Sequence, residues 1–148
     1  MKKHYKAVCY QGYRKGQSKR KGIFPTKEQI LEDLLILERD FEAIRVYDSS
    51  IHTEDILAVI KEHNINLKVM LSMYMHAEHP HNQPSSVVEE AFLFNKQRNN
   101  DLAQKVISLA KEYPDIICCI SAGNEARSIW NVNQVSDGRI AEVVSMIK

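Results

Sequence analysis

Short apolar runs alternate with stretches of helical periodicity along the whole chain. The runs predict four strands, at residues 7–10, 43–48, 67–74 and from 116 onward. The intervening stretches repeat apolar residues every three or four positions, and they predict four helices that begin near Thr26, Thr53, Ser86 and Ser136. Four successive strand-helix units predict parallel strands joined by right-handed crossovers.

Polar residues mark the ends of these helices, and apolar residues mark their inward faces. Thr26 with Gln29 and Ser86 with Glu89 have the spacing of a capping box. The predicted buried positions are Ile30, Leu34, Leu37, Ile56, Val59, Ile60, Ile140, Val143, Val144 and Ile147. The third helical stretch has a polar middle, residues 95–101, which predicts either a break or one exposed face.

Two architectures fit this α/β pattern. One is an open doubly wound sheet, and the other is half of a (β/α)8 TIM barrel, since a whole barrel typically needs about 250 residues. The 148 residues predict a single domain, 1–148. Gly12 and Gly16 do not form the G-x-G-x-x-G pattern, so a dinucleotide site is disfavoured.

Charge and cysteine content bound the class of protein. Twenty basic and nineteen acidic residues nearly cancel, which points to neither nucleic acid nor a membrane as partner. The basic residues at 14–15 and 19–21 have no acid among them, and they predict either a solvated loop or a patch for an anionic partner. Three cysteines and no apolar leader favour a cytoplasmic protein, with the thiols as inert core residues.

The segment Ile116–Glu125 is the most informative part of the chain. Its continuous apolar run is typical of a strand buried on both faces of a parallel sheet, and it ends in Gly123, Asn124 and Glu125. Catalytic groups of parallel barrels lie where strands end and loops begin. Glu125 is therefore a candidate general acid or base, the alternative being a carboxylate that caps the local backbone.

Aromatic and basic residues near the other strand ends are candidate sugar contacts. Alternation places Arg45 and Tyr47 on one face of the second strand, where Arg45 either orients a carboxylate or forms a structural ion pair. Trp130 and Tyr10, with Tyr13 beside it, can stack on a sugar ring or belong to the core.

The loop after the third strand contains His76, Glu78, His79 and His81. These residues are irregularly spaced around two prolines, unlike the four ordered ligands of a structural zinc site. We expect neither a metal nor another cofactor.

Three segments together resemble glycoside hydrolase family 17, the β-1,3-glucanases and related transglycosylases. They are Cys9–Arg14, Ile44–Asp48 and Gly123–Glu125, which follow in the right order at strand ends. The resemblance is to the N-terminal half of the family's (β/α)8 barrel, and closest to its bacterial members. It implies a retaining reaction on a β-glucan, with Glu125 as general acid/base and Asn124, Arg45 and Tyr47 in contact with substrate.

The family's nucleophile is a second Glu at the end of the seventh strand, and this chain reaches Lys148 soon after its fourth. Retaining hydrolysis needs two carboxyl groups about 5 Å apart. We therefore expect glycosidase activity only if a C-terminal half or a second copy completes the barrel, and in a homodimer Glu78 would stand near the partner's acid. The alternative is a half-barrel that binds carbohydrate, or assembles as an oligomer, without turnover.

Overall fold

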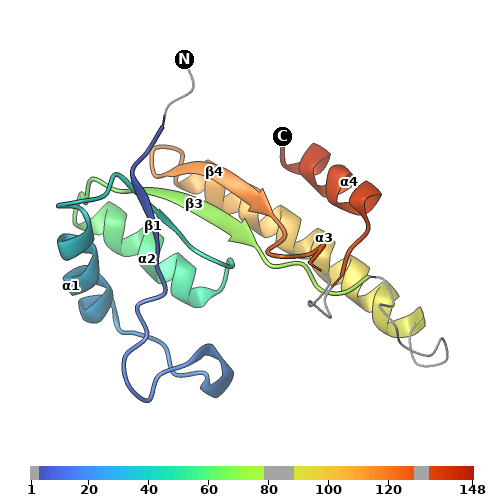
Figure 1. Cartoon of the computed structure of the whole chain (residues 1–148), viewed down its shortest axis with the longest axis horizontal. Helices are drawn as coiled ribbons and strands as arrows, with labels where there is room; N and C mark the ends of the chain where they lie inside the picture. The colour runs from blue at the N-terminus through green and yellow to red at the C-terminus, as the bar shows by residue number, and fades with distance from the viewer. Residues whose placement is uncertain (1–3, 79–88, 129–133) are drawn as a thin grey trace. The chain divides into compact units, whose positions relative to one another are not determined.

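The computed structural model describes residues 4–78, 89–128 and 134–148, in which strands alternate with helices (Figure 1). The strands are β1 (Ala7–Cys9), β2 (Ala43–Arg45), β3 (Lys68–Met73) and β4 (Ile117–Ala122). The helices are α1 (Lys27–Leu37), α2 (Ile51–Glu62), α3 (Glu89–Glu112), α4 (Asp137–Ile147) and a short 3-10 helix, η1 (Lys19–Lys21). In these ranges no helix has the length and apolar content needed to cross a membrane.

The strand order decides between the two predicted architectures. The four parallel strands follow one another as β1-β2-β3-β4, with Ala43 opposite both Ala7 and Lys68. A doubly wound sheet would reverse its order at a switch point, whereas here each strand adds to the same side. The predicted fold, four β-α units of a (β/α)8 barrel, is confirmed.

The chain divides into two compact units. The first comprises Met1–Leu71 and Tyr113–Cys119, and the second comprises Ser72–Glu112 and Ile120–Lys148. The assignment of 1–148 to a single domain stays a prediction.

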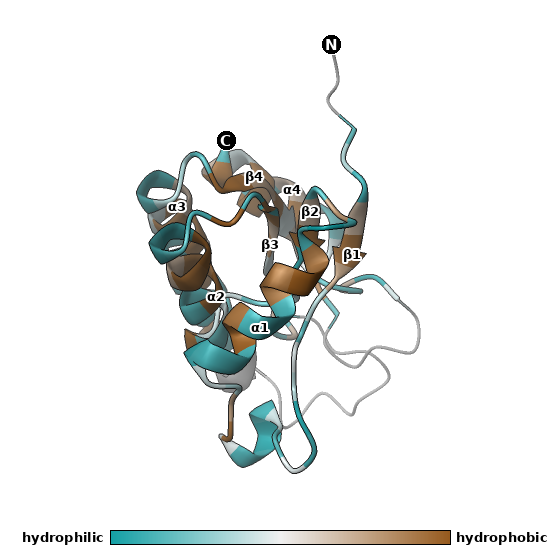
Figure 2. Cartoon of the chain, turned by 90° about the vertical axis from the view of Figure 1, so that its left-hand side faces the viewer, coloured by the Kyte–Doolittle hydropathy of each residue, from teal (hydrophilic) through white to brown (hydrophobic). Residues whose placement is uncertain are grey.

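The core of the first unit follows from strand alternation. In residues 43–48, here called the β2 segment, Ile44 and Val46 are buried, whereas Arg45 and Tyr47, which alternate with them, are only half-buried. Helices α1 and α2 pack together, and their polar and apolar faces are visible in Figure 2. Their buried apolar side chains are Ile30, Leu34, Ile56, Leu57, Val59 and Ile60, which include most of the predicted positions.

The two helix starts of the first unit differ in how well the sequence indicated them. At α1, Thr26 Oγ1 accepts from the Gln29 amide at 3.3 Å and Gln29 Oε1 accepts from the Thr26 amide at 3.1 Å, so the capping box is confirmed. Helix α2 begins at Ile51 rather than after Thr53, which is a correction. The Thr53 hydroxyl donates instead to the Asp48 carbonyl, 3.0 Å away.

In the second unit, α3 continues unbroken through its polar middle. Asn99 in that middle is fully buried and bonds to the loop after β3, so the segment is neither a break nor a merely exposed face. Helix α4 is capped by Ser136, as predicted, and Val143 lies in the core. The predicted start of α3 at Ser86 lies outside the described residues.

Strand β4 corrects one expectation about burial. It lies at the edge of the sheet order, and both Cys118 and Cys119 on it are exposed, as is Cys9 on the opposite edge strand β1. Although its sequence is an apolar run, β4 has no fully buried residue in the described structure. The Cys118 sulfur is nevertheless partly shielded, since it lies 3.5 Å from the Val69 carbonyl oxygen. This partial desolvation, together with the neighbouring Cys119 thiol, raises the pKa of Cys118 to about 11, so the thiol stays protonated at neutral pH.

Candidate functional site

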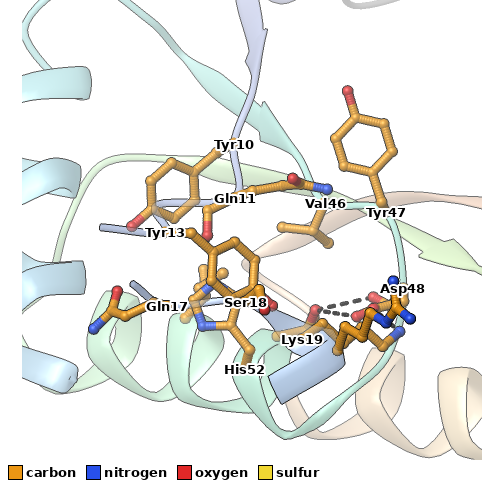
Figure 3. A pocket seen from close by; sticks show the side chains of 13 residues that line it. Tyr10, Gln11, Tyr13, Gln17, Ser18, Lys19, Val46, Tyr47, Asp48 and His52 are labelled. Atoms are coloured by element: carbon orange, nitrogen blue, oxygen red, sulfur yellow. Dashed lines mark hydrogen bonds and ion pairs between the residues drawn. The ribbon is translucent and has the colours of Figure 1, made fainter. Parts of the chain in front are cut away.

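A cavity of about 370 Å³ lies in the first unit, where β1 and β2 end (Figure 3). Its volume lies within the range of small-molecule sites. The walls combine aromatic and polar side chains from the loop after β1, the end of β2 and the first turns of α2. The lining residues are Tyr10, Gln11, Tyr13, Gln17, Ser18, Lys19, Arg20, Val46, Tyr47, Asp48, His52, Thr53 and Ile56.

An aromatic cluster forms one wall of the cavity. The His52 ring lies 5.3 Å from Tyr13 and stacks with Phe24 at 6.2 Å, centroid to centroid. His52 is 5% exposed, and its Nε2 lies 2.7 Å from the Gln11 carbonyl oxygen. If Nε2 carries the proton, this contact is a hydrogen bond and Nδ1 is an acceptor, for which the described part of the chain offers no donor.

Asp48 is the fixed anion of the cavity. Its Oδ1 accepts from the Ser50 amide at 3.0 Å and from the Ser50 hydroxyl at 2.7 Å, and Oδ2 lies 2.5 Å from Lys19 Nζ. Burial alone would raise the pKa of Asp48, but the bonds from Lys19 and Ser50 outweigh it and lower the pKa to about 2. Asp48 is therefore a carboxylate at any physiological pH, and it ties η1 to the end of the β2 segment.

Tyr10 lines the cavity, but its hydroxyl is engaged elsewhere. It donates to Asp33 Oδ2 on α1 at 3.0 Å. Arg14 binds the same carboxylate through its two terminal guanidinium nitrogens, Nη1 at 2.8 Å and Nη2 at 2.6 Å. Burial and the negative charge of Asp33 raise the pKa of Tyr10. A Cβ on Gly12 would lie 2.3 Å from the Tyr10 hydroxyl, which makes glycine necessary there. Tyr10 is only 7% exposed, and its bond to Asp33 anchors the loop after β1 to α1.

The basic residues of this loop are partly neutralised by acids from elsewhere. Arg14 pairs with Asp33 and Glu32, and Lys19 with Asp48. Arg14 and Lys19 therefore fasten the loop to α1 and to the β2 end. Lys15, Arg20 and Lys21 are exposed, as expected for the solvated loop that was one of the two predictions.

Arg45 and Tyr47 lie on one face of the β2 segment, as alternation predicted. The Arg45 guanidinium lies over the Tyr47 ring, 5.1 Å from its centroid. In Figure 3 the Tyr47 ring points away from the Lys19–Asp48 pair. This cation–π contact holds the Tyr47 ring in place, and Tyr47 stays half-buried.

Asn124 and Glu125 lie in the second unit, on the turn that follows β4. The turn is held by the Gly123 amide, which donates to the Met73 carbonyl at 2.9 Å, and by the Ser128 amide, which donates to the Glu125 carbonyl at 2.9 Å. Asn124 is half-buried and the Glu125 side chain is exposed.

Glu125 has a backbone φ of 53°, in the left-handed region that few residues other than glycine adopt. Such conformations persist only where the surrounding structure imposes them, and they concentrate at functional sites. Gly123 has φ 82°, and a Cβ there would lie 3.0 Å from the Ala126 Cβ. The turn is therefore constrained at the residue that the sequence singled out.

The histidine loop is described only in part, because His79 and His81 lie outside the described residues, as does Trp130. His76 packs edge-on against Tyr74 at 5.6 Å, and Glu78 pairs with Arg139 at 2.9 Å. Within the described ranges, no three His, Cys, Asp or Glu side chains gather as metal ligands.

Sequence reasoning did not find His52, Asp48, Asn99 or Arg139. His52 and Arg139 stand in helices beside apolar residues, and a polar residue at an inward helical position was the available signal for both. Asp48 was noted as the end of the second strand and of the Ile44–Asp48 segment, without a role of its own. Asn99 was grouped with a polar stretch that the chain uses in tertiary hydrogen bonds.

Neither a protein-family model nor a curated protein sequence matches the chain. A solved structure does match: the crystal structure of an endo-laminarinase from Formosa Hel1_33_131, with a TM-score of 0.75 and 27% identity. The chain has a glycoside hydrolase-like fold. The match covers 95% of this chain and 36% of the laminarinase, so the chain spans about a third of that protein's length.

Proposed function

We propose that this chain is the N-terminal part of a family 17-like glycoside hydrolase barrel that acts on β-1,3-glucan-type carbohydrates. The single observation that carries the proposal is the structural match to an endo-laminarinase across 95% of the chain. The three strand-end segments quoted above support the family, since they carry its motifs in order.

The cavity of the first unit suits a sugar. A pyranose presents apolar ring faces and hydroxyls at its edge, and the cavity offers Tyr13 beside Asp48 and Gln17. In this proposal Tyr47, fixed by Arg45, stacks on a further sugar unit, and Tyr10 contributes its ring edge while its hydroxyl holds Asp33.

Glu125 is proposed as the general acid/base. It would protonate the leaving glycosidic oxygen and then take a proton from the incoming water or sugar hydroxyl, while Asn124 holds a substrate hydroxyl. Trp130, outside the described residues, is proposed as a further stacking surface. The constrained backbone of Glu125 supports this role, because an acid must meet the leaving oxygen in a fixed orientation.

Turnover also needs a second carboxylate, which in family 17 comes from the seventh strand. We propose that a C-terminal half-barrel or a second copy of the chain supplies it. Light scattering across a dilution series tests the second possibility: closure by a second copy requires a dimer at micromolar concentration, and a monomer would leave only the C-terminal half.

The experiment for the proposed reaction compares Glu125→Gln with Glu112→Gln on a β-1,3-glucan oligosaccharide, in the chain or the completed barrel. Glu112 lies at the exposed end of α3 and serves as the matched control. Glu125→Gln should lower kcat at least about 100-fold, while Glu112→Gln should leave it unchanged. Retained turnover in Glu125→Gln would refute the acid role.

The second candidate function is carbohydrate binding without turnover. It is favoured by the length of the match, because only about a third of the laminarinase is covered. Wild-type protein that binds the oligosaccharide without cleaving it, with the same Kd in Glu125→Gln, would establish this alternative.

A further inference from the structure

A buried ion pair in the second unit has no part in the reaction proposed above. Arg139 Nε, in the first turn of α4, donates to both Glu78 oxygens, at 3.2 and 2.9 Å. The two side chains are only 6% and 10% exposed. Burial of two charges costs desolvation that a well-packed apolar pair would avoid, so the pair is weak evidence of stabilisation.

The surroundings of the pair are polar and matched to it. Asn99 Nδ2 donates to Glu78 Oε1 at 2.7 Å, and Arg139 Nη2 donates to the Asn100 side chain. Arg139 Nη1 lies 2.9 Å from Glu142 Oε2 as an ion pair. Burial alone would lower the pKa of Arg139, but Glu78 and Glu142 outweigh it, so the guanidinium stays charged.

The network first fastens the loop after β3. Asn99 Oδ1 accepts from the His76 amide at 2.8 Å, and Asn99 Nδ2 also donates to the His76 carbonyl at 2.9 Å. Asn95 Nδ2 donates to the Ala77 carbonyl at 2.8 Å. Because Asn99 binds both the backbone of this loop and the Glu78 carboxylate, the place of Glu78 is set from α3.

The network then reaches the turn of Glu125 through residues 134–135. The Glu78 amide donates to the Gln134 carbonyl at 3.1 Å, and Gln134 Nε2 donates to the Ser128 carbonyl at 3.1 Å. The Val135 amide donates to the Ala126 carbonyl at 3.0 Å. Residues 134–135 thus connect the Glu78–Arg139 pair to the turn of Glu125 at two of its residues, Ala126 and Ser128.

We propose that Glu78 and Arg139 are positioning residues that hold the Glu125 turn in its left-handed backbone conformation. The role of Glu125 in catalysis rests on the proposed function. The hydrogen bonds that join the Glu78–Arg139 pair to the Glu125 turn do not, since they all lie within the second unit. This role replaces the predicted one for Glu78 as a reacting carboxylate, because its oxygens are already bonded to Arg139 and Asn99.

The test removes both charges at once, in a Glu78→Gln/Arg139→Met double variant, because loss of one partner leaves a buried unpaired charge. The readout is the ¹³Cα chemical shift of Glu125, which reports its backbone conformation, with amide exchange at residues 124–128. We expect the shift to leave the left-handed range and exchange to rise at least about tenfold. An unchanged shift and unchanged exchange would overturn the proposal.

Two further variants make the test specific. Lys27→Gln/Glu62→Gln removes an exposed ion pair of the first unit and should change neither readout. Gln134→Ala removes one bond to the turn and leaves the buried pair intact, so it reports on the link even if the double variant fails to fold. Gln134→Ala should raise exchange at residues 125–128, and the same exchange as wild type would contradict the link.

Where the completed barrel cleaves the oligosaccharide, the double variant should lose about 100-fold in kcat while KM changes little, as expected when a reacting group is misplaced by about 1 Å. A protein without any turnover would refute the proposed function and leave the chemical-shift result to decide the positioning role. A rise in KM with unchanged kcat would overturn that role.

Discussion

At the scale of single residues, two places combine unusual conformation or charge pairing with a proposed role in function. Gly123 and Glu125 both adopt left-handed backbone within one turn, and glycine tolerates this at no steric cost whereas glutamate does not. Asp48 is the other place, since its carboxylate joins the cavity loop to the start of α2.

Gly123→Ala should destabilise the protein by about 1–3 kcal/mol, because the new Cβ meets the Ala126 Cβ at 3.0 Å in a left-handed conformation. Gly138→Ala is the matched control: nothing lies within 4 Å of its Cβ position in α4, and alanine should stabilise that helix by about 0.5–1 kcal/mol. Urea unfolding measures both. Equal effects of the two substitutions would show that the turn is not constrained.

Asp48→Asn should lower stability at pH 7 by about 2 kcal/mol. The pKa of Asp48 is lowered from 3.8 to about 2, so its contribution is fully present above pH 3.8 and is lost as the pH falls through 2. Unfolding curves of wild type and variant should therefore converge near pH 2.

The control for this pH dependence is Asp137→Asn, whose carboxylate is 81% exposed in its ion pair with Arg127. An exposed pair contributes under about 1 kcal/mol, so this variant should follow wild type closely. A gap between wild type and Asp48→Asn that is independent of pH would refute the account of Asp48.

At the scale of elements, the sequence predicted the order of the four strands and four α-helices that the structure describes, but not the short 3-10 helix η1 at Lys19–Lys21. It predicted the α1 capping box because Thr26 and Gln29 interact locally. It placed the N-cap of α2 at Thr53, three residues after the observed N-cap Ser50, because the Thr53 hydroxyl donates to the Asp48 carbonyl instead of capping a helix. It also misjudged β4, since an apolar run alone does not show whether a strand lies at an edge.

Thr26→Ala should destabilise the protein by about 1 kcal/mol, the usual effect of losing a side-chain cap. Lys27→Ala, one residue later, removes only an exposed ion pair and should change stability by under about 0.5 kcal/mol. Thermal unfolding compares the two. A Thr26→Ala variant as stable as wild type would mean that the capping box contributes nothing measurable.

At the scale of the whole molecule, four consecutive β-α units give a sheet in sequential order, and this could be predicted from alternation except for the choice between barrel and open sheet. The candidate acid and the candidate sugar contacts on β2 were selected from strand ends, and their roles stay predictions. The cavity was not, because its walls come from the loop after β1 and from α2, which meet only in the fold. A polar residue at an inward helical position was a signal for His52, but its contact with the Gln11 carbonyl joins positions 41 residues apart, so that partner could not be found from local sequence.

The central claim is that this chain takes a β-1,3-glucan-type carbohydrate in the cavity of its first unit. The most direct test is an NMR titration of the isotopically labelled chain with a β-1,3-linked glucose oligosaccharide. We predict saturable shifts at Tyr13, Tyr47 and His52, weakened in Tyr47→Ala and unchanged in Glu112→Gln. Unchanged spectra up to millimolar β-1,3-linked oligosaccharide would contradict the claim.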